Sequence, residues 1–202
     1  MKLCPAVFLD RDGTLIEHVH HLVDPSQVRL IPGAAEAVIR LRAAGYQIVL
    51  VTNQSVIGRG FLTEEGLDRV HAEMNKQLAA RGTQVDGIYF CPVAPTVSDP
   101  RLVDHPDRKP GPGMLLRAAR ELDLDLRQSW MVGDMVSDLL AGRNAGCKGS
   151  ILVRTGHGQK QEGIEGHATY VATDLLEAAQ WILSDPRLPQ SLHADGARSG
   201  GG

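Results

Sequence analysis

The chain has 202 residues, of which 43% are hydrophobic and 22% are charged, a composition typical of a globular domain with a full-sized core. Its formal net charge of -3 gives no electrostatic basis for a nucleic-acid partner, and no apolar run is long enough to cross a membrane. The cysteines Cys4, Cys91 and Cys147 are widely spaced and odd in number. They therefore predict no disulfide framework and favour a cytoplasmic location.

Short apolar runs typical of buried strands alternate along the chain with segments typical of helices. The strands are predicted at residues 6–9, 48–51, 85–90, 130–132, 151–153 and 170–171. The helices are predicted at residues 33–44, 63–82, 111–122, 137–145 and 173–183. This alternation predicts an α/β fold with a doubly wound, mainly parallel sheet. We expect one domain over residues 1–184 and a loose tail rich in Pro, Ser and Gly over 185–202.

The strongest chemical signal follows the first predicted strand. Asp10 and Asp12 stand two residues apart, and Gly13, Thr14 and Leu15 come directly after them. In doubly wound sheets, ligands bind at the carboxyl ends of the strands. An isolated pair of aspartates could simply form a polar turn, but the longer string Asp-x-Asp-Gly-Thr-Leu is far more specific.

Three more polar segments are expected at the same edge of the sheet. Thr52 and Asn53 follow the second strand and can hold phosphate oxygens, although they could equally form a turn. Lys109 precedes a predicted helix N-terminus, an arrangement that suits phosphate. Asp134 follows the fourth strand and is placed to bind a hard cation. Asp138 could help to hold that cation, or could only be an acidic residue in the first turn of a helix.

These four segments resemble the active-site motifs of the haloacid dehalogenase superfamily of phosphotransferases. The resemblance covers residues 1–172 and implies a Rossmann-like fold. It makes Asp10 the nucleophile that forms a phospho-aspartate and Asp12 the general acid and base. It also makes Thr52 and Lys109 catalytic residues that contact the phosphate, and Lys109 pairs with the nucleophile as well.

The same resemblance implies a magnesium cofactor. Its ligands would be the carboxylates of Asp10 and Asp134, the backbone carbonyl of Asp12, and Asp138 through a water molecule. The gaps between the motifs leave no room for a domain-sized cap, with about forty residues from Asp12 to Thr52. We therefore expect an open site whose specificity depends on loops.

Finer details resemble one subgroup, the heptose 1,7-bisphosphate 7-phosphatases and the related histidinol-phosphate phosphatases. The string Asp-Arg-Asp-Gly-Thr, the segment Thr-Asn-Gln-Ser and the Arg-Lys-Pro segment carry this resemblance. It implies removal of the 7-phosphate of a small phosphorylated sugar, in the synthesis of lipopolysaccharide or a related glycan. We expect the protein to be a cytoplasmic monomer. Histidinol phosphate or another small phosphate ester remains an alternative, as does a non-catalytic binding module. The predicted substrate-binding residues are Asn53, Gln54, Arg59, Arg108 and His20, although Arg59 could equally be a solvated surface arginine.

One segment departs from the subgroup. Most members hold a structural zinc ion with Cys-x-His and a later Cys-x-Cys, whereas this chain has Cys91, Val93, His105 and Asp107 at those places. Structural zinc sites are usually four-coordinate with cysteine and histidine ligands. A segment with a single cysteine thiolate cannot supply such a set of four ligands, so we expect no bound zinc.

Overall fold

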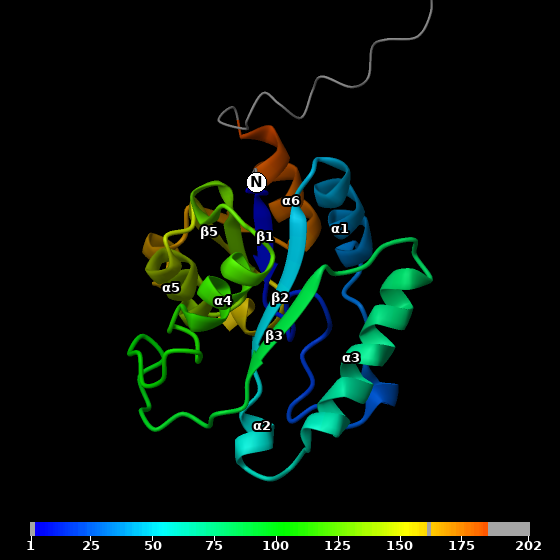
Figure 1. Cartoon of the computed structure of the whole chain (residues 1–202), viewed down its shortest axis with the longest axis vertical. Coiled ribbons are helices and arrows are strands. Elements are labelled where there is room, and N and C mark those ends of the chain that lie inside the picture. Colours follow the sequence, from blue (N-terminus) through cyan, green and yellow to red (C-terminus); the bar gives the residue numbers. More distant parts are fainter. Residues whose placement is uncertain (1–2, 161–162, 186–202) are drawn as a thin grey trace, which may run out of the picture.

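The computed structural model describes residues 3–160 and 163–185. Among these residues, six parallel strands form one sheet in the order β3-β2-β1-β4-β5-β6 (Figure 1). The strands are β1 (Ala6–Leu9), β2 (Gln47–Asn53), β3 (Gly87–Cys91), β4 (Trp130–Gly133), β5 (Gly149–Val153) and β6 (Tyr170–Ala172). The sequence-based prediction of a doubly wound, mainly parallel sheet is confirmed.

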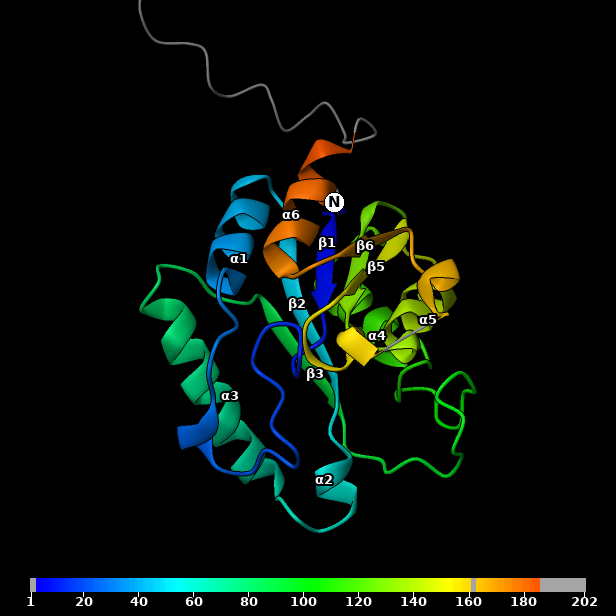
Figure 2. The same cartoon turned by 180° about the vertical axis from the view of Figure 1, so that it is seen from behind.

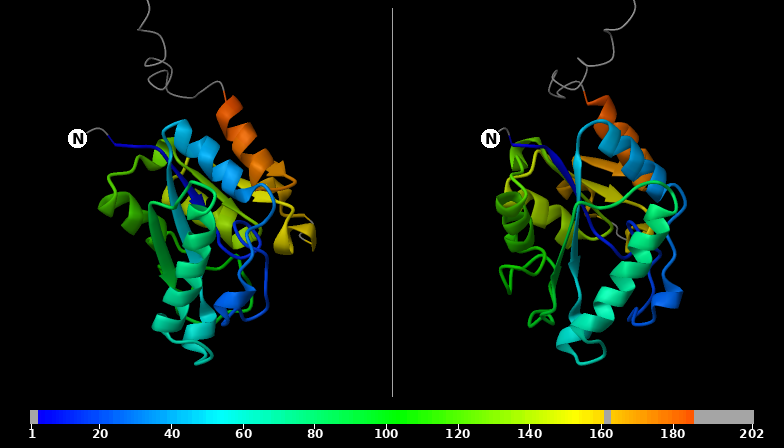
Figure 3. Two further views of the ribbon diagram at one scale, coloured as in Figure 1. Left: turned by 90° about the vertical axis from the view of Figure 1, so that its right-hand side faces the viewer. Right: turned by 45° about the vertical axis from the view of Figure 1, so that its right-hand side comes forward.

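Helices cover both faces of the sheet, as Figure 3 shows. Helices α1 (Ala34–Ala43), α3 (Glu64–Ala79) and α6 (Leu175–Ser184) pack on one face, and α4 (Gly113–Glu121) and α5 (Val136–Ala145) pack on the other. The sequence did not predict the short elements, which are α2 (Ser55–Gly58) and the 3-10 helices Pro25–Gln27, Leu126–Gln128, Gly156–Lys160 and Glu165–His167. Each of these short elements has too few residues to show a periodic pattern.

The alternation of side chains along β1 explains why this strand is apolar throughout. Val7 and Leu9 belong to the core beneath α1, α3 and α6, whereas Ala6 and Phe8 belong to the core beneath α4 and α5. All four are fully buried, and burial of a side chain such as leucine or phenylalanine contributes roughly 1.5–3 kcal/mol. A strand covered on both faces thus has no polar position before its end, and the first polar side chain after it is Asp10.

Strand β2 extends two residues further than predicted. Thr52 and Asn53 pair with Phe90 and Cys91 of β3 and therefore lie inside the strand, not in a turn after it. Backbone pairing with a neighbouring strand outweighs the preference of threonine and asparagine for turns at these positions. Their place at the carboxyl end of the sheet is as expected. The view from behind in Figure 2 shows α2 directly beyond this end of β2.

Two long connections lie near the carboxyl ends of the strands. Residues 10–33 link β1 to α1, and residues 92–112 link β3 to α4. Within the described residues, neither connection contains a further strand or a domain-sized insertion. No helix of the described chain combines the length and the apolar character that a membrane crossing requires. The predicted tail lies outside the described residues except for Asp185, which is buried with its carboxylate 3.4 Å from Lys148 Nζ.

Candidate active site

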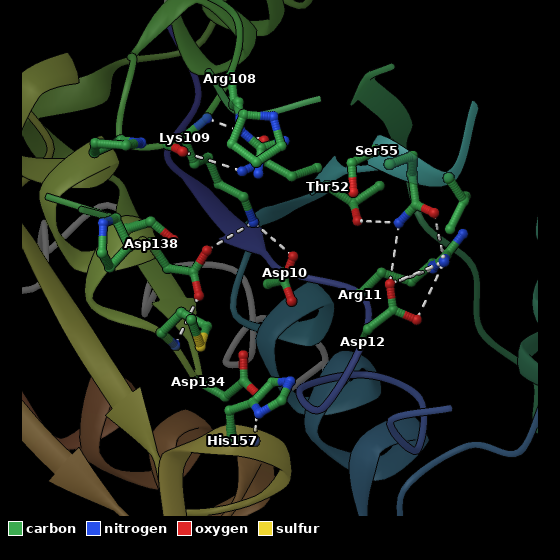
Figure 4. A pocket seen from close by; sticks show the side chains of 18 of the residues that line it. Asp10, Arg11, Asp12, Thr52, Ser55, Arg108, Lys109, Asp134, Asp138 and His157 are labelled. Atoms are coloured by element: carbon green, nitrogen blue, oxygen red, sulfur yellow. Dashed lines mark hydrogen bonds and ion pairs between the residues drawn. The ribbon is translucent and has the colours of Figure 1, made fainter. Parts of the chain in front are cut away.

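A cavity of about 360 Å³ opens at the carboxyl ends of β1, β2 and β4. Its size is within the usual range for a small-molecule site. The four predicted segments meet here, although they lie far apart in the sequence, and Figure 4 shows their side chains around Asp10. The cavity-lining residues include Asp10, Asp12, Thr52, Asn53, Gln54, Arg108, Lys109, Asp134 and Asp138.

Lys109 lies between two carboxylates. Its Nζ donates to Asp10 Oδ1 over 2.5 Å, is 2.7 Å from Asp138 Oδ1, and donates to the carbonyl of Val51 over 2.8 Å. Burial alone would lower the pKa of Lys109, but the Asp10 and Asp138 carboxylates outweigh it and raise that pKa above its usual range. The ammonium group is therefore charged at ordinary pH.

Asn53 holds the backbone of Lys109 in place. Asn53 Nδ2 donates to the carbonyl of Lys109, and Asn53 Oδ1 accepts from the Lys109 N–H, both over 3.0 Å. These two bonds join the end of β2 to the loop before α4. Asn53, which was predicted to bind substrate, therefore also has a structural role, because both ends of its side-chain amide are paired with the Lys109 backbone.

Asp138 has two partners that serve different purposes. Its Oδ2 accepts the backbone N–H of Met135 over 2.9 Å and so caps the first turn of α5, while its Oδ1 pairs with Lys109. The Asp138 side chain thus both caps a helix and lies in the site beside Lys109, while its role in holding a cation stays a prediction. Asp134 follows β4, and its Oδ2 accepts the backbone N–H of His157 over 2.7 Å.

The donor set fits a hard divalent cation. Asp10, Asp134 and Asp138 each offer a carboxylate oxygen, and these three oxygens lie within 4.8 Å of one another. Burial raises the pKa of Asp10 to about 7 in spite of Lys109, and burial together with the carboxylates of Asp10 and Asp138 raises the pKa of Asp134 to about 8. One ammonium group does not neutralise three buried carboxylates, so the cluster has both the charge and the oxygen ligands that magnesium prefers.

Asp12 points away from this cluster toward β2 (Figure 4). Its carboxylate accepts from Arg11 Nε over 3.1 Å, from Arg11 Nη2 over 2.8 Å, and from Gln54 Nε2 over 3.0 Å. Gln54 Nε2 also donates to Thr52 Oγ1 over 2.8 Å. Gln54, predicted to bind substrate, is thus buried with its amide engaged by protein groups, although it still borders the cavity.

Comparison with known proteins identifies the family. Residues 7–78 match the family model described as haloacid dehalogenase-like hydrolase, and residues 107–178 match the model described as HAD-hydrolase-like. The D-glycero-beta-D-manno-heptose-1,7-bisphosphate 7-phosphatase of Pasteurella multocida is 44% identical over 88% of this chain and 96% of its own length. The chain belongs to the haloacid dehalogenase-like hydrolases.

Other relatives of this haloacid dehalogenase-like hydrolase are also named heptose bisphosphate phosphatases. The D-glycero-D-manno-heptose-1,7-bisphosphate 7-phosphatase of Thermosynechococcus vestitus is 42% identical over 89% of this chain and 96% of its own length. A crystal structure of D,D-heptose 1,7-bisphosphate phosphatase from B. bronchiseptica, complexed with magnesium and phosphate, is 36% identical and superposes with a TM-score of 0.78. That match covers 89% of this chain and 98% of the other.

The other predicted substrate residues of this haloacid dehalogenase-like hydrolase separate into two groups. Arg108 lines the cavity, where its Nη1 donates to the carbonyl of Val93 over 2.9 Å. His20 and Arg59 are exposed and are not among the residues that line it. From the same histidine-rich loop, His18 and His21 line the cavity instead. The sequence pattern shows a cluster of histidines, but only the path of the loop decides which of them faces the site.

Sequence reasoning also missed three side chains near the site of this hydrolase. Arg11 is 1% exposed beside Asp12, His71 contacts Arg11, and the ring of His157 packs against His18 at 4.2 Å between ring centroids. A signal existed for His71, because it falls on the buried stripe of α3 with Leu67 and Met74. A histidine on such a stripe more often packs in the core than takes part in a site, so this position alone did not indicate a functional role for His71.

The segment that departs from the zinc-binding subgroup is held by other contacts. Cys91 Sγ lies 3.9 Å from His105 Nδ1, and the same nitrogen accepts the backbone N–H of Asp107 over 3.2 Å. The Asp107 carboxylate pairs with Arg117 Nη1 of α4 over 2.8 Å. The carboxylate that a zinc ion would need as a further ligand is thus paired with an arginine. Absence of zinc remains a prediction.

Proposed function

We propose that this chain is a magnesium-dependent phosphatase that removes the 7-phosphate of D-glycero-D-manno-heptose 1,7-bisphosphate through a phospho-aspartate at Asp10. The reaction type is supported mainly by the position of Asp10. Its carboxylate pairs with Lys109, and one of its oxygens lies within 4.8 Å of carboxylate oxygens of Asp134 and Asp138. The substrate is supported by the activity for which two relatives are named, each of which matches this chain over nearly its full length.

In the first step, a carboxylate oxygen of Asp10 attacks the phosphorus atom at position 7. The bond between phosphorus and the sugar oxygen breaks, and Asp12 gives that oxygen a proton. Lys109 stays charged beside the nucleophile and stabilises the negative charge on the phosphoryl oxygens. The hydroxyl of Thr52, which lines the same cavity and accepts from Gln54 Nε2, would donate to one of these oxygens.

In the second step, Asp12 accepts a proton from the water molecule that attacks the phospho-aspartate. The bond between phosphorus and Asp10 breaks, so that phosphate leaves and the Asp10 carboxylate is restored. Asp10, Asp134, Asp138 and the backbone carbonyl of Asp12 would hold magnesium, which would supply charge neutralisation for the phosphoryl group. All these groups come from one chain, so we propose that a cytoplasmic monomer is catalytically complete.

A substrate panel tests the proposal. Phosphate release is measured for both anomers of the heptose bisphosphate, for heptose 7-phosphate and for histidinol phosphate, with magnesium and with a chelator. We expect the bisphosphate to have the highest kcat/KM, and we expect the chelator to stop turnover. A higher kcat/KM for histidinol phosphate would overturn the substrate, and binding of the bisphosphate without any phosphate release would overturn the enzymatic role.

A further inference from the structure

Arg11 places a buried positive charge next to the proposed general acid and base. Its guanidinium is 1% exposed and pairs with both oxygens of Asp12, through Nε and Nη2. Nη2 also donates to Gln54 Oε1 over 2.9 Å, and Nη1 lies 3.2 Å from His71 Nε2. A buried charged donor destabilises the fold unless it is hydrogen-bonded, so each acceptor around Arg11 helps to fix its orientation.

His71 supplies the acceptor on the side of Arg11 opposite to Asp12. It belongs to α3 and is 6% exposed. Arginine can only donate, so the Nε2 atom of His71 accepts in this contact and its ring proton resides on Nδ1. Burial, together with the charge of Arg11, lowers the pKa of His71 to about 4. The imidazole is therefore neutral at ordinary pH and remains able to accept.

Gln54 closes the network on the other side. Its amide oxygen accepts from Arg11, while its amide nitrogen donates to Asp12 and to Thr52 Oγ1. The Asp12 carboxylate is thus held by two side chains, and one of these is held in turn by α3. Groups with several fixed hydrogen bonds lose rotational freedom, which lets a catalytic side chain keep a productive orientation.

We propose that His71 is a positioning residue for the phosphatase reaction, acting through Arg11 to hold Asp12 as the base that receives the proton of the attacking water. This inference rests on the proposed function. The contact with Arg11 fixes the direction of the Asp12 carboxylate, which must orient a free water molecule in the second step. Loss of the His71 acceptor should therefore slow hydrolysis of the phospho-aspartate more than its formation.

Three variants test the role of His71. His71→Leu removes the acceptor, His71→Gln retains one, and Gln77→Leu is a matched control on the same helix. Gln77 bonds to the carbonyl of Val28 and the N–H of Leu30, outside the Arg11 network. For each protein we measure kcat, KM, melting temperature and the steady-state fraction of acid-stable phosphorylated protein formed from labelled substrate.

We expect His71→Leu to lower kcat by about tenfold, to lower KM in parallel so that kcat/KM changes little, and to raise the phosphorylated fraction. His71→Gln should restore most of kcat. Gln77→Leu should change melting temperature but neither kcat nor the phosphorylated fraction. A His71→Leu protein with reduced melting temperature and normal kcat, or a loss of kcat without a rise in the phosphorylated fraction, would overturn the inference.

A variant at Arg11 tests the same hydrogen-bond network if His71→Leu does not fold. Arg11→Lys keeps the positive charge but cannot bind Asp12, Gln54 and His71 at once, and it should show the same fall in kcat and rise in phosphorylated protein. A normal Arg11→Lys enzyme would refute the role of the network. Wild-type protein that releases no phosphate from any substrate would instead refute the proposed function, so the two failures are distinguishable.

Discussion

Lys109 donates a 2.5 Å hydrogen bond to Asp10 although 99 residues separate them in the chain. The first residue precedes α4 and the second follows β1, so this contact exists only when the sheet and α4 are packed together. The same ammonium group lies 2.7 Å from Asp138. One cation is therefore shared between the proposed nucleophile and the cap of α5.

Asp10→Asn should reduce phosphate release by at least about a thousandfold, because an amide is a poor nucleophile. The fold should persist, since the amide oxygen can still accept from Lys109. Steady-state assays and thermal melts measure the two effects. Asp68→Asn, an exposed change on α3, is the control and should retain full activity. Substantial turnover by a contamination-free Asp10→Asn preparation would contradict the role of Asp10.

The metal-free protein should become less stable as pH rises from about 4 to about 8. Unfolded aspartates lose their protons near pH 4, whereas folded Asp10 and Asp134 keep theirs up to pH values of about 7 and 8. These two groups therefore bind more protons in the folded state across this window, and their contribution to the free energy of unfolding falls with increasing pH. His71, with its pKa lowered to about 4, opposes them below about pH 6.5 but is one group against two. Thermal melts in chelator across this range measure the effect.

Magnesium should oppose that loss, because it binds the ionised carboxylates of the folded state. We expect a larger rise in melting temperature with magnesium at pH 8 than at pH 5. Asp134→Ala should reduce this rise and weaken the activation of phosphate release by magnesium, whereas Asp68→Ala should change neither. Equal magnesium effects in wild type and Asp134→Ala would show that Asp134 is not a ligand.

Gly13→Ala should lower the activity of the protein because the added methyl group would displace the Asp134 carboxylate. Gly13 has a φ of 84°, and an added Cβ would overlap the Asp134 carboxylate and come within 2.9 Å of Gly156 Cα. Gly82 is a matched control, because its φ is 76° and its added Cβ would meet nothing within 4 Å. Both changes should cost about 1 kcal/mol of stability from backbone strain.

The difference between the two glycine variants then isolates the effect on the site. We expect Gly82→Ala to keep normal kcat/KM and Gly13→Ala to lose at least about tenfold, because a displaced carboxylate is a poor metal ligand. Kinetics at saturating magnesium and thermal melts separate activity from stability. Similar activities in both variants would show that Asp134 tolerates displacement.

Purified protein should contain far less than one zinc ion per chain. Val93 has no ligand atom, and the Asp107 carboxylate is paired with Arg117. Elemental analysis measures the metal content, and a strong zinc chelator should leave the melting temperature unchanged. Structural zinc contributes directly to folding. Stoichiometric zinc together with a chelator-induced fall in melting temperature would therefore contradict this prediction.

The sequence alone was sufficient to predict the architecture and the main active-site segments. Apolar runs alternating with helical segments indicate a parallel sheet, and the carboxyl ends of parallel strands lie along one edge. Asp10 and Asp134 each follow such a run, so their proximity could be expected from local pattern and chain order alone. The same logic located Thr52, although pairing with β3 extended the strand through it.

Only the tertiary structure determined which polar side chains contact one another and which of them line the cavity. Arg11 and His71 meet because α3 packs against the connection between β1 and α1, and 60 residues separate them. Likewise, His18 and His21 rather than His20 line the cavity, because the path of the loop sets the direction of each side chain. Such contacts depend on distances of a few ångströms between segments remote in the chain. Local hydrophobic periodicity carries no information about those distances, since it reports only which face of each element is buried.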